Sequence, residues 1–396
     1  MNAPVPFTEA LPEDRFSRLR LIGWWEQKKI EAMRVLVVGC GALGNEILKN
    51  LALLGVRQVV VADPDNVEVT NLSRSVLFRR EDLGQPKVAA ASRGVRQIFS
   101  ECAVQPLVMN VVQQLGLGVV LWADFIIGGV DNREARLWIN RAAWKLNKPW
   151  IDGGIEGING VARVFIAGKA PCYECTLGET DWALLERRMS CNLLVRDPAP
   201  EGKVPTTPTI SSIIAAVQVQ EAVKLVHGLP TLAGKGLIFE GLNHSSYRVE
   251  YTENPECQSH YTLPVVLRVG RRSDELTLVE LLEYASQELG ASAILEFSRD
   301  VISRLVCPQC NQAEDVFAPV GSVPYEQGFC PADGKMRVVE TAHSFSGNEW
   351  YGRRKLSELG LPLFDVFTAR SGEQEIGLLM AGDHAQVLGE FSSEAA

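Results

Sequence analysis

The sequence predicts an α/β fold, in which a doubly wound, Rossmann-like and mostly parallel sheet is followed by a smaller C-terminal α+β region. Two observations carry this prediction. Between residues 34 and 147, short β-branched segments alternate with segments whose apolar residues recur at helical spacing. A glycine-rich turn joins the first of these strands to the first helix. We therefore divide the chain into a helical N-terminal segment at 1–33, a main domain at 34–261 and a C-terminal region at 262–396.

The elements of the main domain follow in chain order. Residues 34–38 are apolar and β-branched, so they predict a strand that runs directly into the turn 39–44. Residues 45–54 carry apolar side chains at helical spacing, and Gly55 follows them, which is typical of a helix that ends in a left-handed residue. Further elements are expected in this order: strands over 58–62 and 125–130, and a helix over 132–147.

The middle and the end of the chain have a different pattern. Residues 177–209 are rich in Gly, Pro, Thr and charges with weak periodicity, which predicts a long irregular crossover loop. Apolar spacing then predicts a helix over 211–227. In the C-terminal region we expect short strands over 265–269 and 363–368, with an amphipathic helix over 278–289.

Composition and charge exclude several classes of protein. Hydrophobic residues make up 46% and charged residues 22% of the chain, which is the balance of a soluble globular protein. The 48 acidic residues outnumber the 39 basic ones and give a net charge of -9, which argues against a nucleic-acid partner. The sequence has neither a secretory signal nor an uninterrupted apolar span, so we expect no membrane partner and a cytoplasmic location. Nine cysteines, an odd number, argue against a disulfide framework.

The glycine-rich turn predicts a nucleotide site. Gly39 would form the tight turn after the strand, Gly41 would let the backbone approach a phosphate, and Gly44 would let the helix pack closely. The N-terminus of the helix adds amide donors and a partial positive charge. Asp63 ends the next strand, at the interval expected of a carboxylate that binds ribose hydroxyls. The alternative is a tight turn that binds no ligand.

Polar residues further on indicate which nucleotide is bound. Asn71, Arg74 and Lys87 would place one amide and two cations near the turn, and Asp131 follows a second buried strand. Two cations and a nearby acid suit ATP with Mg²⁺, whereas the pyrophosphate of a dinucleotide is held mostly by backbone amides. The alternative for Arg74 and Lys87 is a solvated surface pair. NAD is the alternative nucleotide, because the glycine turn and Asp63 would serve it equally well.

Two Cys-x-x-Cys pairs predict zinc. Cys172 with Cys175, and Cys307 with Cys310, can each supply two thiolates, and four thiolates close a tetrahedral Zn²⁺ site. A separate C-terminal site made by Cys307, Cys310 and Cys330 is an alternative that leaves the first pair without a metal. Redox motifs and unligated buried thiols are further alternatives.

Cys191 is interpreted differently from the other cysteines. It follows Arg187 and Arg188 at the start of the predicted crossover loop, and neighbouring cations favour the thiolate, which is the nucleophilic form. Cys191 is therefore a candidate nucleophile, with an inert buried cysteine as the alternative. Cys102 and Cys257 are interpreted as packing residues, and the five histidines show no ligand spacing.

Together these residues resemble the E1-like activating enzymes, the adenylyltransferase family of ThiF, MoeB and the ubiquitin-activating enzymes. The resemblance extends over about residues 13–230 and rests on the turn 39–44, Asp63, the segment 71–74, Lys87 and Asp131. It implies that Asp63 binds ribose and that Asp131 holds Mg²⁺. It also implies that Asn71, Arg74 and Lys87 contact the phosphates of ATP.

The same resemblance implies a function. The chain would adenylate the C-terminal glycine of a ubiquitin-like β-grasp protein, capture the acyl group on Cys191 as a thioester and pass it to an E2-type acceptor, as in a bacterial conjugation system. It implies a homodimer in which Arg18 reaches the ATP of the neighbouring subunit. It also implies one Zn²⁺, held by both Cys-x-x-Cys pairs, that joins the main domain to the C-terminal region. A MoaD/ThiS-type sulfur-carrier adenylyltransferase is the alternative within the family; an NAD-dependent oxidoreductase and a non-catalytic nucleotide-binding scaffold are alternatives outside it.

Overall fold

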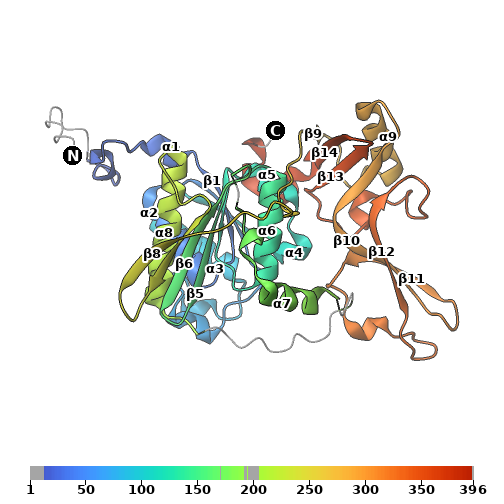
Figure 1. The fold of residues 1–396 in the computed structure, drawn as a ribbon, viewed down its shortest axis with the longest axis horizontal. Helices are drawn as coiled ribbons and strands as arrows, with labels where there is room; N and C mark the ends of the chain where they lie inside the picture. The colour runs from blue at the N-terminus through green and yellow to red at the C-terminus, as the bar shows by residue number, and fades with distance from the viewer. Residues whose placement is uncertain (1–12, 170, 191–193, 195–204, 395–396) are drawn as a thin grey trace.

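The chain folds around two β-sheets, which the computed structural model describes for residues 13–169, 171–190, 194 and 205–394 (Figure 1). The larger sheet has eight strands in the order β3-β2-β1-β4-β5-β6-β7-β8. The strands from β3 to β5 in this order pair in parallel, and β6, β7 and β8 extend the sheet antiparallel. Their bounds are β1 Arg34–Val38, β2 Gln58–Ala62, β3 Ala103–Leu107, β4 Phe125–Gly128, β5 Trp150–Glu156, β6 Asn159–Phe165, β7 Lys235–Glu240 and β8 Ser245–Glu250. The predicted α/β fold class is confirmed.

Both faces of the parallel strands are buried. On β1, Val35 and Val37 belong to one core cluster, whereas Leu36 and Val38 belong to the cluster on the opposite face. A strand covered on both faces reads as a continuous apolar run, which explains why the sequence located β1 and β2 to the residue.

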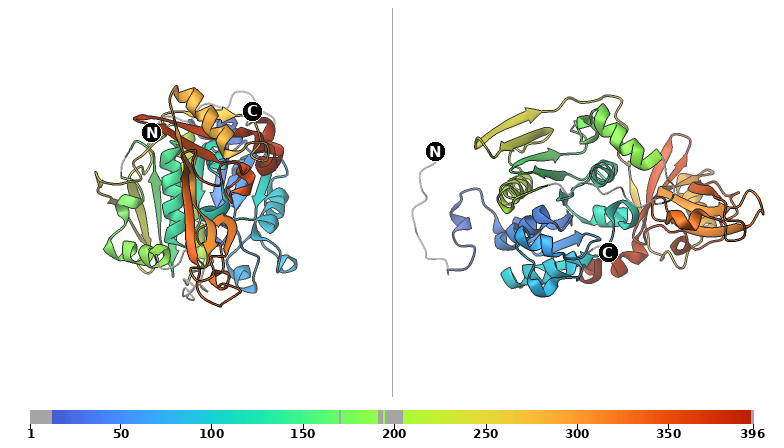
Figure 2. Two further views of the ribbon diagram at one scale, coloured as in Figure 1. Left: turned by 90° about the vertical axis from the view of Figure 1, so that its right-hand side faces the viewer. Right: turned by 90° about the horizontal axis from the view of Figure 1, so that it is seen from below.

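Helices cover the two faces of the large sheet (Figure 2). The first face carries α2 Ala42–Leu54, α3 Lys87–Ile98 and α8 Pro208–Val226, and the second carries α4 Val111–Gln114, α5 Leu117–Trp122, α6 Arg133–Lys145 and α7 Glu179–Ser190. By length and composition α8 would suffice to cross a membrane. Its buried residues, among them Ile210 and Ile214, pack in the first core cluster, as expected of the core helix of a globular domain.

Two predicted segments differ from the structure. The N-terminal segment predicted as helical at 1–33 contains less helix than expected: its described part, residues 13–33, has only η1 Leu19–Leu21 and α1 Gln27–Glu31, separated by a turn at Gly23. The crossover loop predicted as irregular over 177–209 contains the helix α7. Asp181 accepts a hydrogen bond from the backbone N–H of Gly178 (3.1 Å) at the start of this helix, and acidic residues there complement the helix dipole.

The second sheet, in the C-terminal region, has the order β11-β10-β13-β14-β9, and β12 pairs with β10. Its elements are β9 Val266–Val269, α9 Leu278–Leu289, β10 Ile294–Val306, β11 Ala313–Pro319, β12 Val338–Phe345, β13 Val366–Ser371, β14 Gln374–Met380 and α10 His384–Leu388. This region packs directly on α4 and α5: Asp365 Oδ1 accepts a hydrogen bond from the Leu117 N–H (2.8 Å), and Trp122 stacks on Phe391. The two sheets therefore share one core cluster.

Candidate functional site

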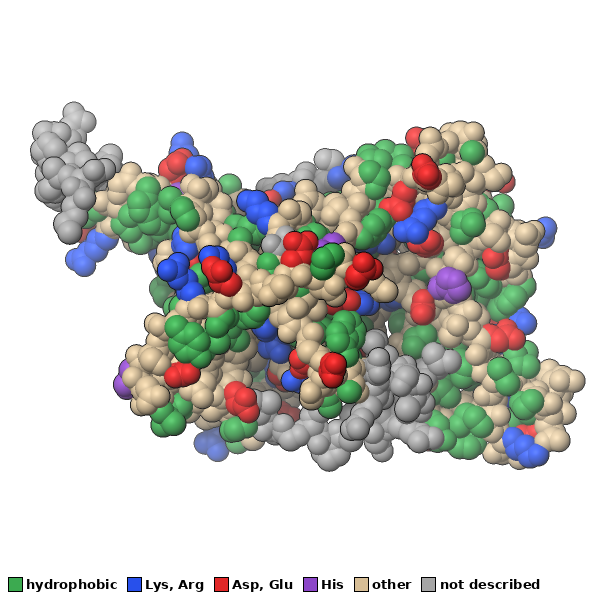
Figure 3. Space-filling model, viewed as in Figure 1, with side chains coloured by type: hydrophobic (Ala, Val, Ile, Leu, Met, Phe, Trp, Pro, Cys, Tyr) green, Lys and Arg blue, Asp and Glu red, His purple; other side chains and the backbone are tan. Residues whose placement is uncertain are grey.

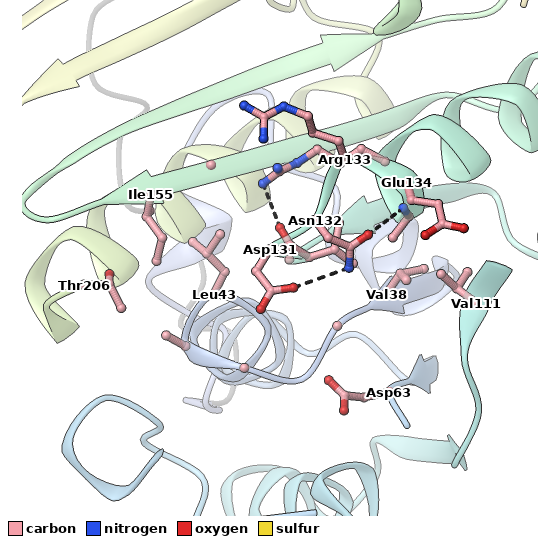
Figure 4. Close-up of a pocket in the computed structure, with 18 of the residues that line it drawn as sticks. Val38, Leu43, Asp63, Val111, Asp131, Asn132, Arg133, Glu134, Ile155 and Thr206 are labelled. Atoms are coloured by element: carbon pink, nitrogen blue, oxygen red, sulfur yellow. Dashed lines mark hydrogen bonds between the residues drawn. The ribbon is translucent and has the colours of Figure 1, made fainter. Parts of the chain in front are cut away.

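A cavity of about 1110 Å³ opens at the carboxyl ends of the parallel strands, where doubly wound sheets bind their ligands. Residues at the ends of three strands line it: Val38 is the last residue of β1, Asp63 follows β2 and Asp131 follows β4. Figure 4 shows side chains from these separate segments around a common space. The cavity thus lies where the sequence predicted the nucleotide.

Each of the three glycines in the turn is required for a different structural reason. Gly39 has a φ of 93°, and a Cβ there would lie 2.6 Å from the backbone oxygen of Gly129. A Cβ on Gly44 would lie 2.0 Å from the backbone oxygen of Gly39, so this residue lets the first turn of α2 pack against the loop. Gly41 lines the cavity at the N-cap of α2, and a Cβ there would meet nothing within 4 Å. Only an open position of this kind lets a phosphate approach the helix N-terminus.

Asp63 is held rigidly at the tip of β2. Its two carboxylate oxygens accept backbone N–H donors from Cys40 (2.7 Å) and Asp65 (2.9 Å). Burial raises the pKa of Asp63, and this effect is opposed by the charge of Lys87 and by the two backbone hydrogen bonds. The remaining acceptor capacity of the carboxylate faces the cavity and can receive hydroxyl donors such as those of a ribose.

The two predicted cations and the amide are brought together at the cavity. Lys87 begins α3, and its Nζ lies 2.7 Å from Oδ2 of Asp65. Burial would lower the pKa of Lys87, but the charges of Asp63 and Asp65 raise it overall, so the ammonium stays protonated. Arg74 donates to the Thr70 carbonyl oxygen (2.8 Å), and Asn71 is buried beside it. All three line the cavity, as does Asp131.

The other predicted residues are placed differently. Asp131 is exposed at the start of α6, where Asn132 donates to its Oδ1 at 3.5 Å and caps the helix through the Ala135 N–H. Arg18 is exposed at the beginning of η1 and is not among the residues that line the cavity of its own chain. Cys191 lies outside the described residues.

The structure also shows a buried charge network that sequence reasoning missed. Asp152, at 0% exposure on β5, accepts a hydrogen bond from Arg136 Nε (3.0 Å) and another from Arg163 Nε (2.9 Å), and both arginines line the cavity. Although burial alone would raise the pKa of Asp152, the two guanidinium groups lower it overall. An aspartate that directly follows two large apolar residues, in Trp150-Ile151-Asp152, is the signal that could have identified it.

Beyond the phosphate-side cations the cavity continues between α7 and the antiparallel strands. Arg133 and Asp181 form an ion pair there (2.6 Å). The same end is lined by Gly154, Gly160, Tyr173, Thr206 and Ile238. Residues of the nucleotide-side turn and residues near α7 therefore line the same cavity of about 1110 Å³.

The predicted single zinc site made by both Cys-x-x-Cys pairs is wrong, because the two pairs lie in separate clusters. Cys172 and Cys175 gather with Cys257 and His260, and the four ligand atoms lie within 4.8 Å of one another. The Sγ atoms of Cys172 and Cys257 are 3.5 Å apart, and Cys175 Sγ lies 3.3 Å from His260 Nε2. Three thiols and an imidazole form a donor set that suits tetrahedral Zn²⁺.

The Cys-x-x-His spacing of Cys257 and His260 is the signal that was overlooked. Cys257 packs against Trp144, Ala167 and Cys172, as its interpretation as a packing residue predicted, and it also belongs to this candidate ligand cluster. Cys307 and Cys310 gather instead with Cys330 and Asp333. The alternative of a C-terminal site with Cys330 therefore describes this second cluster better, although it also left the first pair without partners. Each pair is completed by residues close to it in the fold, which the order along the chain does not reveal.

Comparisons with known proteins place the chain among relatives. The ThiF family profile matches residues 14–259, which is more than half of the chain. The NEDD8-activating enzyme E1 catalytic subunit of Arabidopsis thaliana is 40% identical over 160 residues, covering 37% of this chain and 35% of the plant enzyme. The sulfur carrier protein adenylyltransferase of Thermus thermophilus is 29% identical over 286 residues, covering 68% of this chain and 94% of the bacterial enzyme.

Solved structures share the fold. E. coli MccB, crystallised with ATP, superposes with a TM-score of 0.52 at 22% identity, covering 63% of this chain and 75% of that one. The chain spans about a third of the length of the plant relative and nearly all of the Thermus enzyme. The predicted resemblance is confirmed by the family match and by the glycine turn, acid and cations around one cavity. This chain belongs to the ThiF family, the E1-like adenylyltransferases, whose activity implies the use of ATP.

Proposed function

We propose that the chain uses ATP and Mg²⁺ to adenylate the C-terminal glycine of a ubiquitin-like β-grasp protein. The acyl group then passes to Cys191 as a thioester and from there to an E2-type protein. The observation that carries this proposal is one cavity of about 1110 Å³, which is lined by the glycine turn, Arg74, Lys87 and Asp131 and also by residues of β5, β6 and α7.

The cation arrangement suits the first step. An oxygen of the carrier's carboxylate attacks the α-phosphorus of ATP, the bond between the α-phosphorus and the bridging oxygen breaks, and pyrophosphate leaves. Both reactants are anionic, so fixed positive charge lowers the cost of their approach and stabilises the charge that develops. Arg74 and Lys87 supply this charge, Asp63 orients the ribose, and Asp131 is the carboxylate that would hold Mg²⁺. When bound, Mg²⁺ offsets phosphate charge.

The far end of the cavity suits an extended peptide tail. Gly154 of β5 and Gly160 of β6 line it, so the backbone of two paired strands forms its wall beside the path proposed for the tail. Ion pairs with Asp152 hold Arg136 and Arg163 beside this path. In the second step the Cys191 thiolate would attack the acyl carbon, and AMP would leave.

The N-terminal segment supports a homodimer. Leu21 and Trp24 are exposed by 68% and 41%, and Figure 3 shows apolar side chains gathered on the segment next to the N-terminal end. Contiguous exposed apolar side chains are typical of association surfaces. Arg18 lies on the same segment, so a partner bound there would bring this arginine towards the partner's own ATP.

The cluster of Cys172, Cys175, Cys257 and His260 would hold Zn²⁺ as a structural ion. Four protein ligands leave no open position for a substrate, so the site would stabilise the fold without taking part in the chemistry. The aromatic ring of Trp144 stacks on His260 at 4.4 Å between ring centroids and fixes the orientation of the imidazole.

Sulfur-carrier activation is the second candidate, and the Thermus relative that the chain covers over 94% of its length favours it. One experiment tests both candidates. Carrier proteins ending in Gly are offered with ATP, and exchange of labelled pyrophosphate into ATP is measured. An adduct on Cys191 that reducing agent removes, and that Cys191→Ala lacks, supports conjugation. Adenylate without an adduct favours the sulfur carrier. If no carrier protein supports pyrophosphate exchange, or if Lys87→Ala exchanges pyrophosphate as fast as the wild-type protein, the proposal is contradicted.

A further inference from the structure

Two matching turns stand in the C-terminal region, outside the segment matched by the family. Residues 307–312 read Cys-Pro-Gln-Cys-Asn-Gln, and residues 330–335 read Cys-Pro-Ala-Asp-Gly-Lys. In each turn the first residue's N–H donates to the carbonyl of the sixth, at 2.9 Å for Cys307 and 2.7 Å for Cys330. In each, the fifth residue is left-handed and donates its N–H back to the first, with φ values of 56° at Asn311 and 70° at Gly334. The two segments therefore have the same backbone conformation.

This conformation points two side chains of each turn at the same spot. Cys307 Sγ lies 3.3 Å from Asp333 Oδ2, Cys310 Sγ lies 3.7 Å from Cys330 Sγ, and all four ligand atoms are within 4.8 Å of one another. Zinc bonds of about 2.3 Å to sulfur and 2.0 Å to oxygen give tetrahedral edges of about 3.8 Å between two sulfurs and 3.5 Å between sulfur and oxygen. The distances between these ligand atoms in the structure are close to such edges.

The cluster joins the ends of three strands. The first turn begins directly after Val306, the end of β10, and the second precedes β12. Val306 pairs with Ala313 of β11 and with Val338 of β12, so both neighbouring strands meet at the level of the cluster. The small core beneath them contains four buried residues, Leu194, Ile302, Leu305 and Val323. A hydrophobic core of this size needs additional stabilisation, such as a bound metal ion, to hold the surrounding strands together.

Leu194 belongs to the segment predicted as the crossover loop and packs in this small core of the C-terminal region. It is 4% exposed, and its Cδ1 lies 2.5 Å from where a Cβ on Gly328 would stand. Gly328 ends η5 Tyr325–Gly328, and the second turn starts two residues later at Cys330. The pocket that receives Leu194 is therefore anchored to the cluster. Leu194 is also the third residue after Cys191 in sequence.

We propose that Cys307, Cys310, Cys330 and Asp333 bind a Zn²⁺ ion of their own, distinct from the ion held around Cys172, and that this second ion fixes the pocket for Leu194. Three thiolates and one carboxylate complete its coordination, so the ion is structural. The metal site does not depend on the proposed function. The pocket for Leu194 gains importance from that function, because Leu194 is only three residues from Cys191 in the sequence.

Metal content of the full-length protein tests the site. The wild-type protein is expected to hold two zinc ions per chain, and Cys310→Ser one, since Cys310 is exposed and its loss disturbs packing least. Cys175→Ser is expected to remove the other ion, and Cys102→Ser, a buried thiol outside both clusters, is expected to keep two. One ion in the wild-type protein, lost in Cys175→Ser but kept in Cys310→Ser, would overturn the proposal.

Cobalt substitution tests Asp333 separately. Sulfur-to-cobalt charge transfer grows with the number of thiolates, so Asp333→Cys should strengthen this absorption relative to the wild-type protein, and Cys310→Ser should weaken it. Spectra that are unchanged in both variants would contradict Asp333 and Cys310 as ligands. Asp333→Cys also guards against a folding artefact, because it preserves the metal while changing the donor.

Hydrogen exchange of the peptides that contain Leu194 tests the second half of the proposal. Loss of the C-terminal ion in Cys310→Ser should raise exchange there, and Leu194→Ala should do the same while both ions remain bound. Exchange that stays at the wild-type level in Cys310→Ser would overturn the link. Pyrophosphate exchange measured on the same samples distinguishes this failure from failure of the adenylation proposal.

Discussion

Changing either of two glycines in the same turn to alanine is expected to have a different effect: Gly44→Ala should lower stability, and Gly41→Ala should weaken ATP binding. A Cβ on Gly44 would lie 2.0 Å from the backbone oxygen of Gly39, whereas ordinary contact begins at about 3.4 Å. The atom that the new Cβ would meet belongs to the backbone and cannot move to another rotamer, so the loop or the helix must move by about 1.4 Å. Overpacking of this kind costs about 3 kcal/mol. The better helix propensity of alanine offsets about 1 kcal/mol, so Gly44→Ala should lower the free energy of unfolding by about 2 kcal/mol.

Gly41→Ala should behave in the opposite way. A Cβ on Gly41 meets nothing within 4 Å, so the free energy of unfolding should stay within about 0.5 kcal/mol of the wild-type value. The new methyl group would point into the space that a phosphate needs to reach the amides at the start of α2. ATP should therefore bind at least about tenfold more weakly, a loss of about 1.4 kcal/mol.

Denaturant unfolding and calorimetric titration with ATP measure the two quantities. Gly270→Ala serves as the control, because its Cβ also meets nothing within 4 Å and it does not line the cavity. A Gly44→Ala variant as stable as the wild-type protein would refute the close packing of helix and turn. A Gly41→Ala variant with wild-type affinity for ATP would refute phosphate binding at this position.

Three further predictions concern charge and nucleophile. Asp152→Ala leaves two guanidinium groups without their carboxylate and should lower the free energy of unfolding by about 3–5 kcal/mol in denaturant titrations. The folded-state pKa of Asp152 is lowered, so the stabilisation by this carboxylate is present above its unfolded-state pKa near 3.9 and is lost as pH falls through its folded-state pKa. The wild-type protein should therefore lose stability in acid more steeply than Asp152→Ala. Equal slopes of unfolding free energy against pH in the two proteins would contradict this. Lys87→Ala should reduce pyrophosphate exchange by about 100-fold with an unchanged circular dichroism spectrum, and normal exchange would exclude Lys87 from the phosphate site. Cys191→Ser should keep pyrophosphate exchange while losing the reducible adduct in gel assays, and an adduct that persists would assign the nucleophile elsewhere.

Burial explains which elements the sequence could predict. The strands at 34–38 and 58–62 and the helix at 278–289 were predicted to the residue, because continuous apolar runs and amphipathic spacing report burial directly. The helix α7 was missed because its stability depends on tertiary contact: Leu185 is 1% exposed within a sequence that is mostly polar. Local periodicity carries little information about such a helix.

The candidate site residues likewise fall into those that the sequence order predicted and those that it did not. The turn, Asp63 and the cations occur near the ends of successive strands, and parallel topology places those ends together, so sequence order sufficed to predict them. The metal clusters could not be assigned in this way. Cys257 is 85 residues from Cys172, and only the fold shows that it, and not Cys307, completes the first cluster. A ligand motif predicts that a metal is bound, but its partner motif is a property of the tertiary structure.

The position of the C-terminal region shows that it forms part of the cavity's support. Val111 and Val112 of α4 line the cavity, and Arg299 of β10 donates to the carbonyl oxygens of Val112 (2.8 Å) and Leu115 (2.6 Å). Those are orphan carbonyls at the end of a short helix, so the arginine stabilises a helix that has few contacts of its own. Because β10 leads from Arg299 to the turn that carries Cys307 and Cys310, one strand connects the cavity wall with the second cluster. Loss of order in the C-terminal region would therefore be transmitted to the nucleotide end of the cavity through α4, without any change in Asp63, Arg74 or Lys87.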